Sequence, residues 1–306
     1  MAHFVVTGGC GFIGSHLVDS LLGRGDRVTV LDDLSTGKRS NLKAGATLVV
    51  GDVADPDAVQ GVAAGADGIF HLAAVASVQR CNEAWRESHK VNQTGTIDVL
   101  EAARDVGRIP VVYASSAAIY GDNPSTPLRE TEAPRPLTAY GVDKYGSELH
   151  AGVAGRIHGV PTFGFRFFNV FGPRQDPSSP YSGVISIFAD RMINGRDIVI
   201  HGDGGQTRDF VYVGDVVEHL LAGMAAADVA APVANVCTGR ETSVLQLAHT
   251  LRDLTGYTGT ISHGAARAGD IRISVGDPEF AIERLNRRAK IGLAAGLSEL
   301  LAAQIG

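Results

Sequence analysis

A glycine-rich turn near the N-terminus constrains the fold of this chain more than any other stretch. Residues 7–14 read Thr-Gly-Gly-Cys-Gly-Phe-Ile-Gly, after an apolar run at residues 4–6 and before a helical pattern. In a strand–turn–helix unit, glycines allow a sharp turn, close approach of the backbone to a pyrophosphate, and tight packing of helix on strand. The amide groups that begin the helix then face the phosphates. The pattern predicts a dinucleotide site.

The end of the second expected strand supports this interpretation. That strand covers residues 27–32 and ends in Asp32, eighteen positions after Gly14. A carboxylate there accepts hydrogen bonds from a ribose diol and repels a 2′-phosphate, so the site is expected to prefer NAD to NADP. These residues alone leave one alternative, a turn between strand and helix that binds no phosphate and has its aspartate in solvent.

The composition excludes several classes of function. The chain has 306 residues, a hydrophobic share of 44% and a net charge of -6, and it contains no basic block, so no nucleic-acid partner is expected. Its three cysteines are far apart, which predicts no disulfide framework and no metal site. The first strand begins by residue 4, and no apolar run approaches the ~18 residues that span a bilayer. We therefore expect a cytoplasmic protein without a membrane partner.

Short apolar segments alternate with helical patterns through the first half of the chain. The expected strands cover residues 3–7, 27–32, 46–50, 67–72, 109–114 and 161–166. The expected helices cover residues 12–24, 56–64, 83–106 and 138–159. Strands that are apolar on both faces are typical of a buried parallel sheet, and parallel crossovers are right-handed. The pattern predicts an α/β fold with a doubly wound parallel sheet of the Rossmann type.

The rhythm changes after residue 166. A loop rich in proline, glycine and serine covers residues 171–183, and shorter elements follow it. The expected helices cover 184–194, 214–227, 243–255, 278–284 and 297–303, and the expected strands cover 198–200, 209–213, 233–236, 260–263 and 271–275. We expect residues 1–166 to form the cofactor-binding domain, with residues 205–232 returning to it. Residues 167–306 are expected to form mainly a smaller C-terminal α/β lobe, with the substrate in the cleft between the two.

Tyr140 and Lys144 form the candidate catalytic pair. Because they lie four residues apart on an expected helix, they face the same way. A tyrosine titrates near ~10, and an adjacent ammonium together with a nicotinamide ring is expected to lower that pKa enough for base catalysis. Ser115 and Ser116 directly follow a strand, where ligands bind in such sheets, and a hydroxyl there can hydrogen-bond the substrate oxygen. An ordinary helix-surface pair and a polar strand end are the alternatives for the two motifs taken separately.

Together these stretches resemble the extended short-chain dehydrogenase/reductases, and among them the nucleotide-sugar epimerases similar to UDP-glucose and UDP-N-acetylglucosamine 4-epimerases. The matching stretches run almost from end to end of the chain and are residues 8–14, 32–37, 51–53, 71–74, 91–92, 115–121, 140–144, 166–175, 207–211 and 267–271. The resemblance implies a tightly bound NAD, a UDP-sugar substrate and a homodimer formed through the helices at 83–106 and 138–159.

The resemblance also implies roles for individual residues. The catalytic group would be Ser116, Tyr140 and Lys144. The cofactor site would comprise Gly8, Gly11, Phe12, Ile13, Gly14, Asp32, Asp33, Ser35, Thr36, Gly37, Asp52, Val53, Leu72, Ala73, Ala74, Asn92 and Ser115, together with Tyr140 and Lys144. The substrate site would comprise Ser116, Tyr140, Asn169, Val184, Ile200, Arg208, Arg267, Asp270 and Ser274.

The reaction implied is inversion at C4 of a UDP-hexose by transient oxidation to a 4-keto sugar. Ala117 and Ala118 stand where the 4,6-dehydratases carry an acidic pair, so dehydration is not expected. Asp176 stands where UDP-glucuronate epimerases carry an arginine and would repel a carboxylate, which favours a neutral hexose. Ser274 occupies a position that blocks an N-acetyl group when it is bulky. The small serine therefore predicts UDP-Glc and UDP-Gal as substrates, with UDP-GlcNAc and UDP-GalNAc in addition.

Other functions stay open on the sequence alone. A UDP-glucuronate epimerase or a 4-keto-sugar reductase of the same family would use the same residues. A non-catalytic NAD-binding sensor of this fold is a further alternative. Such proteins usually lack the tyrosine or the lysine, and both are present here.

Overall fold

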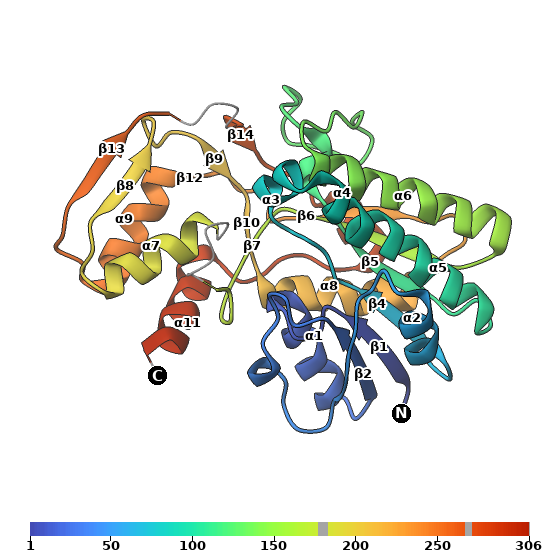
Figure 1. Cartoon of the computed structure of the whole chain (residues 1–306). Helices are drawn as coiled ribbons and strands as arrows, with labels where there is room; N and C mark the ends of the chain where they lie inside the picture. Colours follow the sequence, from blue (N-terminus) through green and yellow to red (C-terminus); the bar gives the residue numbers. More distant parts are fainter. Residues whose placement is uncertain (177–182, 267–270, 306) are drawn as a thin grey trace.

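A seven-stranded parallel sheet forms the centre of the larger lobe (Figure 1). The computed structural model describes residues 1–176, 183–266 and 271–305 of the chain. The strands of this sheet are β1 (His3–Thr7), β2 (Arg27–Asp32), β3 (Thr47–Val50), β4 (Gly68–His71), β5 (Val111–Ser116), β6 (Thr162–Phe167) and β11 (Val233–Val236). Their spatial order is β11-β6-β5-β4-β1-β2-β3, with every neighbouring pair parallel. The chain builds outward from β1 to β3 and then continues on the other side of β1, which confirms the predicted doubly wound α/β fold.

The sheet is buried on both faces because helices cover each of them. Residues of β1 point alternately to the two sides, so that Phe4 and Val6 join one apolar cluster and Val5 joins another. The helices on the first face are α1 (Phe12–Gly23), α8 (Val213–Ala226) and α10 (Glu279–Leu285). The helices on the second face are α2 (Pro56–Ala63), α5 (Gly95–Asp105) and α6 (Ala139–His158). Among the described residues, no helix combines the length and the apolarity needed to cross a membrane.

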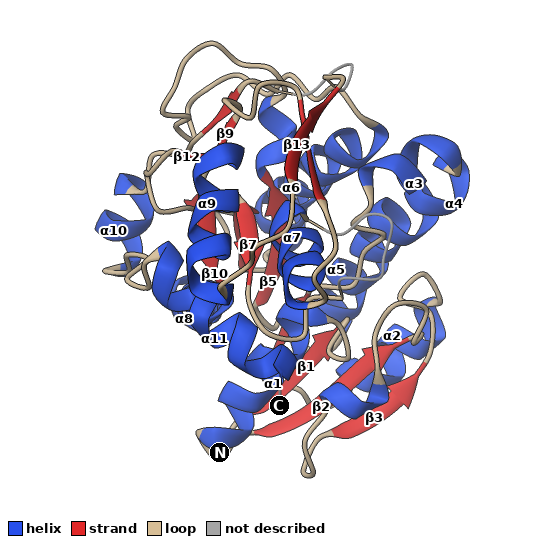
Figure 2. Ribbon diagram, turned by 90° about the vertical axis from the view of Figure 1, so that its left-hand side faces the viewer, coloured by secondary structure: helices blue, strands red, loops and turns tan. Residues whose placement is uncertain are grey.

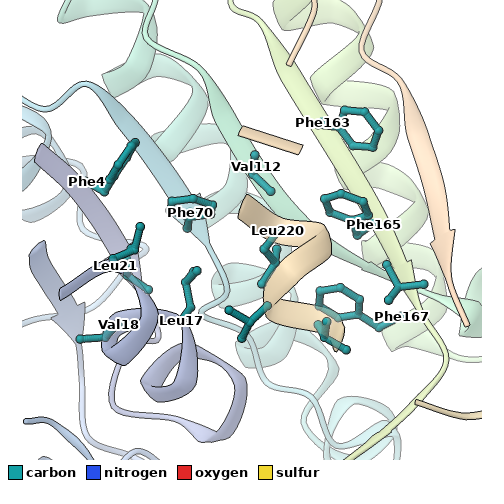
Figure 3. Packing of buried hydrophobic residues seen from close by; sticks show 14 of the residues in the cluster. Phe4, Leu17, Val18, Leu21, Phe70, Val112, Phe163, Phe165, Phe167 and Leu220 are labelled. Atoms are coloured by element: carbon teal, nitrogen blue, oxygen red, sulfur yellow. The ribbon is translucent and has the colours of Figure 1, made fainter. Parts of the chain in front are cut away.

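The first of these clusters holds the helix that follows the glycine turn (Figure 3). Leu17 and Leu21 of α1 lie in one cluster with Leu220 of α8 and with the sheet residues Phe70 and Phe165. Burying a side chain of this size contributes about 1.5–3 kcal/mol. The start of α1 is thereby fixed at the C-terminal end of β1, where a ligand of the sheet would bind.

Local signals set the ends of the helices. Asp55 caps α2 through its side chain, and Pro56 occupies the first position of that helix. Thr138 caps α6 by accepting a hydrogen bond from the Gly141 amide at 3.1 Å. Gly159 ends α6 in a left-handed conformation, with φ 70°. These ends set the register of the helix that carries the candidate catalytic pair.

The helix expected over residues 83–106 is confirmed from Trp85 to Asp105, but the prediction missed a short helix before it and a π-helical turn within it. The elements are α3 (Val78–Glu83), α4 (Trp85–His89), the π-helical turn η2 (Lys90–Thr94) and α5, and the last three are continuous. Helix α3 begins earlier than expected because Ser77 caps it, accepting a hydrogen bond from the Arg80 amide at 3.0 Å. Ala84 then separates α3 from α4 with φ -120° and ψ 57°. A π-helical turn inside a helix is frequent at functional sites.

The smaller C-terminal lobe consists of short strands and the helices that cover them. Its strand sets are β7 (Asn169–Phe171) with β10 (Phe210–Tyr212), β8 (Ile198–His201) with β13 (Ile261–Gly264), and β9 (Thr207–Arg208) with β12 (Thr242–Ser243) and β14 (Ile273–Ser274). Its helices are α7 (Val184–Ile193), α9 (Val244–Thr255) and α11 (Leu293–Ile305). Asp209 separates β9 from β10, because its side chain accepts hydrogen bonds from the backbone of Thr238 and Gly239. Figure 1 shows this lobe beside the large sheet, and in Figure 2 it faces the viewer.

The two lobes meet at the first turn of α1. Phe12 and Ile13 pack against the apolar cluster of the C-terminal lobe, which includes Phe171 and Tyr212. On the other side of these rings, Gly296 of α11 is so close that a Cβ atom there would lie 2.8 Å from each of them. The glycine turn is therefore attached to the core of both lobes.

Candidate active site

The glycine-rich turn lies where the strand order reverses, between β1 and β4. Gly8 has φ 71°, and a Cβ atom there would lie 2.7 Å from the amide nitrogen of Ala73. A Cβ atom at Gly14 would lie 2.2 Å from the carbonyl oxygen of Gly8. Gly11 precedes α1 and provides no side-chain cap, so the first amides of the helix can bind an anion. The turn therefore fits the pyrophosphate of a dinucleotide.

Asp32 lies beside this turn and is 6% exposed. Its two oxygens accept hydrogen bonds from the amides of Cys10 and Leu34, each at 2.9 Å. Burial raises the pKa of this carboxyl, and the two hydrogen bonds act in the opposite direction. Gly37 is required next to it, since a Cβ atom there would lie 2.7 Å from Asp32 Oδ1. Each carboxylate oxygen has a further lone pair, so Asp32 can still accept hydrogen bonds from a ribose diol.

Other predicted cofactor residues lie on the loops that follow β2 and β3. The Asp33 carboxylate accepts hydrogen bonds from the amide and the hydroxyl of Ser35, at 2.9 and 2.7 Å. Thr36 follows in the same loop and is exposed. Asp52 follows β3, and its carboxylate lies 3.5 Å from Lys90 Nζ. These side chains surround the end of β2 on the outer side of the glycine turn.

Two predicted cofactor residues have side chains that make contacts within the protein. Val53 is 5% exposed and belongs to the apolar cluster under the sheet. The Asn92 side chain accepts a hydrogen bond from the Val75 amide at 2.8 Å and donates one to the Val75 carbonyl at 3.2 Å. Asn92 therefore holds the loop after β4 in place, and its side chain supports the site from behind.

The predicted residues Leu72, Ala73 and Ala74 lie on that loop. The amides of Leu72 and Ala73 donate hydrogen bonds to the Thr7 hydroxyl, each at 3.2 Å. That hydroxyl lies 2.8 Å from Nδ1 of His71, whose pKa is lowered to about 3 by burial and by the charge of Lys144. The imidazole is thus neutral, and it ties the end of β1 to the end of β4.

The structure brings the three predicted catalytic residues together at the C-terminal end of β5. Tyr140 and Lys144 face this strand end from α6, and Lys144 Nζ lies 5.9 Å from the centre of the Tyr140 ring. The Ser116 side chain acts on the Tyr140 phenol and lowers its pKa. Lys144 Nζ donates a hydrogen bond to the carbonyl of Ala114 at 2.9 Å. Ser116 is further fixed by the amide of Ala118, which donates to its hydroxyl at 3.1 Å.

In the protein by itself the pKa of Tyr140 shifts upward, whereas the predicted lowering includes the charge of a nicotinamide ring. Burial raises the pKa of Tyr140 to about 12, and the Ser116 side chain offsets only part of the rise. Burial also lowers the pKa of Lys144 to about 8. The lysine does not lower the tyrosine pKa below its usual value, because its ammonium is bound to Ala114 and loss of water dominates at the phenol. The protein without further positive charge therefore keeps the phenol protonated at neutral pH.

Ser115, which was predicted to contact the cofactor, directs its side chain elsewhere. Its hydroxyl donates a hydrogen bond to Glu148 at 2.5 Å. Both oxygens of Glu148 accept hydrogen bonds from Arg166, at 2.9 and 2.7 Å. Arg166 also donates to the Tyr120 hydroxyl at 2.8 Å, and Tyr120 ends the 3-10 helix η3 (Ala117–Tyr120) that follows Ser116. This buried network flanks Ser116 on both sides.

Sequence reasoning missed the role of that network. Two signals for it were available. Glu148 follows Lys144 by four residues and so lies on the same face of α6. Arg166 is a charged residue in a strand whose residues are all buried, so it needs a buried partner.

A cavity of about 400 Å³ lies in the C-terminal lobe, between α7, β8 and β9. Three predicted substrate residues line it, namely Asn169, Val184 and Arg208. The remaining lining residues are Ile187, Phe188, Arg191, Val199, His201, Gln206 and Val244. Apolar side chains on one part of the wall and two guanidinium groups on another suit a ligand with an aromatic base and phosphates.

The Ile200 prediction needs correction. Its side chain is 0% exposed and packs in the core of the lobe, while its neighbours Val199 and His201 line the cavity. In a strand, successive side chains point to opposite faces, so the predicted side chain is one position out of register.

Arg208 of the cavity wall has a neighbour among the substrate predictions, Ser274, and two further predictions lie outside the described residues. Arg208 donates hydrogen bonds to the carbonyls of Thr207 and Ile271, at 2.8 and 2.7 Å. Ser274 pairs with Arg208 across strands β14 and β9. Arg267 and Asp270 lie outside the described residues.

Comparison with known proteins agrees with this geometry. A family model described as "NAD dependent epimerase/dehydratase family" matches residues 4–237. A putative UDP-glucose 4-epimerase of Methanocaldococcus jannaschii is 36% identical over 299 residues, which cover 97% of this chain and 96% of that protein. The structure of UDP-glucose 4-epimerase from Thermotoga maritima with UDP-glucose has a TM-score of 0.95 at 37% identity, covering 99% of this chain and 98% of the other. UDP-N-acetylglucosamine 4-epimerase from Methanobrevibacter ruminantium, solved with UDP-N-acetylmuramic acid, has a TM-score of 0.95 at 32% identity, covering 99% and 98%.

The family match includes the glycine turn, Asp32 and the residues around Tyr140. NAD, the cofactor predicted from the sequence, is the cofactor that the description of the family names. The resemblance seen in the sequence is thereby confirmed, and the chain belongs to the NAD dependent epimerase/dehydratase family.

Proposed function

We propose that this protein is a UDP-hexose 4-epimerase that inverts C4 through a 4-keto sugar and keeps its NAD bound. The observation that carries the proposal is the convergence of Ser116, Tyr140 and Lys144 at the C-terminal end of β5, on the same edge of the parallel sheet as the glycine turn after β1. The names of the similar proteins, both UDP-glucose and UDP-N-acetylglucosamine 4-epimerases, support it. The chemistry that NAD supplies when bound is reversible hydride transfer.

Residues of the chain provide proton transfer, orientation of the substrate and positive charge. Tyr140 takes the proton of the sugar 4-hydroxyl and returns it to the 4-keto oxygen later. Ser116 hydrogen-bonds the same oxygen and orients it. Lys144 binds the nicotinamide ribose and contributes positive charge near the phenol. Because the pKa of Tyr140 alone is about 12, its action as a base at neutral pH requires additional positive charge in the assembled site.

The cavity in the C-terminal lobe is proposed to hold the nucleotide. Val184, Phe188 and Val199 offer apolar surface for the base. Arg208 and Asn169 lie on the same wall and can bind the diphosphate, together with Arg267. Firm binding of the nucleotide leaves the sugar free to turn about its diphosphate, so that either face of C4 can face the cofactor.

A neutral hexose is the proposed sugar. Ala117 and Ala118 form the start of η3 and cannot act as acid and base for dehydration. Asp176 pairs with Lys38 at 3.1 Å and offers no positive charge to a uronate. Ser274 is small and lies beside Arg208, which leaves room for an N-acetyl group. We therefore include UDP-GlcNAc and UDP-GalNAc with UDP-Glc and UDP-Gal.

The protein is proposed to act as a homodimer through α5 and α6. One face of α6 carries the apolar residues Val142, Leu149, Val153 and Ile157, which are 50%, 54%, 42% and 72% exposed. Their spacing of seven, four and four residues puts them on one side of the helix. Light scattering of the purified protein tests this, and Ile157→Asp should shift a dimer toward monomer.

The test of function uses the purified protein with no NAD added. It is incubated separately with UDP-Glc, UDP-Gal, UDP-GlcNAc, UDP-GalNAc and UDP-GlcA, and the configuration at C4 is read by NMR. We expect inversion of the four neutral sugars. Consumption of added NADH in proportion to product would instead indicate a 4-keto-sugar reductase, and inversion of UDP-GlcA would indicate a glucuronate epimerase. A protein loaded with NAD that leaves every sugar unchanged would favour the NAD-binding sensor.

A further inference from the structure

In the sequence, a buried carboxylate lies between the two residues of the candidate catalytic pair. Asp143 precedes Lys144 on α6 and is 2% exposed. One of its oxygens, Oδ1, lies 2.7 Å from Nδ1 of His89 on α4. The other oxygen, Oδ2, is buried and has no hydrogen-bond partner within the described residues. A buried carboxylate with an unsatisfied oxygen is costly unless a positive charge lies nearby.

The buried ammonium of Lys144 likewise lacks the water that would stabilise its charge. Lys144 is also 2% exposed, and burial lowers its pKa to about 8. The negative charge of Asp143 acts against this shift. Consecutive residues on a helix do not face each other, so the two groups share no hydrogen bond. Because both are buried, little water screens the charge of Asp143 at Lys144.

The other titratable groups around α6 do not replace this charge. On α6 itself, Tyr140 is a phenol with a raised pKa, and Glu148 is committed to Arg166. The neighbouring elements contribute Cys81 of α3, a thiol with a raised pKa, the neutral His71 of β4, Lys90 of η2, which is paired with Asp52, and Tyr120 of η3, which is bonded to Arg166. Glu83 of α3 and Glu87 of α4 are exposed, so among the described residues packed on this helix Asp143 is the buried carboxylate, apart from the paired Glu148, that can balance Lys144.

We propose that Asp143, held in place by His89, is a positioning residue that keeps Lys144 protonated and so maintains the positive charge behind the catalytic tyrosine. His89 donates from Nδ1 and fixes the carboxylate in the interface between α4 and α6. The proposal rests on the proposed function in one respect, since it assigns Lys144 its role in the reaction. The competing explanation is a purely structural clip between the two helices.

The charge state of Lys144 can be measured without activity. The chain contains five lysines, and the other four, Lys38, Lys43, Lys90 and Lys290, are exposed. Protein labelled with ¹³C at the lysine ε-carbon is titrated by NMR, and the Lys144 signal is assigned by its absence in Lys144→Arg. In Asp143→Asn we expect the pKa of Lys144 to fall by about one unit, which is a tenfold loss in the ratio of protonated to neutral lysine at a given pH.

Matched variants separate charge from shape. Asp105→Asn removes an exposed carboxylate at the end of α5, and it should leave the Lys144 titration unchanged. His89→Gln keeps the Asp143 charge, so it should shift the titration by less than half as much as Asp143→Asn. If Asp143→Asn does not fold, Asp143→Ser provides the same loss of charge with a smaller side chain. A Lys144 titration that is the same in wild type and in the neutral variants would overturn the proposal.

The pH dependence of C4 inversion connects this measurement with function. Because a lower pKa means that Lys144 loses its proton at lower pH, the alkaline limb of kcat should move down by the same interval in Asp143→Asn. A purely structural clip would lower activity or stability at every pH and leave the limb in place. A shifted NMR titration in a protein without epimerase activity would refute the proposed function only. Normal epimerase activity with an unshifted titration would refute the role of Asp143 only.

Discussion

Removing one partner of the Glu148–Arg166 ion pair should destabilise the protein strongly. The two side chains are 6% and 7% exposed, and they share two hydrogen bonds of 2.9 and 2.7 Å. In Glu148→Gln the guanidinium stays buried without its counter-charge, and Ser115 loses the carboxylate that accepts its hydrogen bond. In Arg166→Met the Glu148 carboxylate likewise stays buried without its counter-charge.

The magnitude follows from the burial of the pair. Removing one member of a buried ion pair costs about 3–5 kcal/mol, because the remaining charge is neither solvated nor paired. A domain is stable by only about 5–15 kcal/mol, so either single variant loses a large share of its free energy of unfolding. The double variant Glu148→Gln with Arg166→Met buries no charge and should recover most of that loss. The exposed pair Arg104–Asp105 is the control, and Arg104→Met should leave the free energy of unfolding almost unchanged.

The assay is urea unfolding followed by circular dichroism. Each variant is unfolded at the same saturating NAD concentration, because a ligand bound to the native state adds to its stability. The four proteins of the cycle then give the coupling free energy of the pair. A loss below about 1 kcal/mol in both single variants, or a double variant whose loss equals the sum of the singles, would refute the reasoning.

Three further predictions address the cofactor, the chemistry and the pH dependence. Gly14→Ala should be purified with little NAD, because its methyl group would lie 2.2 Å from the Gly8 oxygen; a fully loaded variant, by absorbance after denaturation, would contradict this. Tyr140→Phe should lower kcat by about 100-fold or more while NAD stays bound, and unchanged turnover would exclude the tyrosine as the base. The pKa of His71 is about 3 in the fold against an ordinary 6.5, so the unfolded chain binds its proton first. The contribution of His71 to the free energy of unfolding should therefore be fully present above pH 6.5 and fall toward pH 3, by at most about 5 kcal/mol. In His71→Gln the free energy of unfolding should depend less on pH over this range.

The central sheet could be predicted from the sequence because each strand is a short apolar run between turn signals. The strands at residues 3–7 and 27–32 have the predicted bounds. The helix expected over 83–106 is present from Trp85 to Asp105, but the short helix before it and the π turn within it were not predicted. The break at Ala84 and the π turn after it lie in a segment that packs on α6, and local propensity does not encode such contacts.

The candidate site shows the same limit. The spacing of Tyr140 and Lys144 predicts that they share one face of α6, and the strand end predicts where Ser116 lies. The sign of the tyrosine pKa shift could not be read from that spacing, because it depends on how much water the folded chain removes. For the same reason the choice between Ile200 and its neighbours in β8 required the structure, since only the packing decides which face of an apolar strand is the core.

The return of the chain to its first sheet bears on how the protein can be divided. β11 pairs with β6 only after the polypeptide has passed through the C-terminal lobe. A fragment ending at residue 166 would lack this strand and would leave β6 as an open, aromatic-rich edge that invites pairing with another molecule. Attempts to express the cofactor-binding half alone should therefore yield aggregates, and a useful truncation has to preserve residues 233–236.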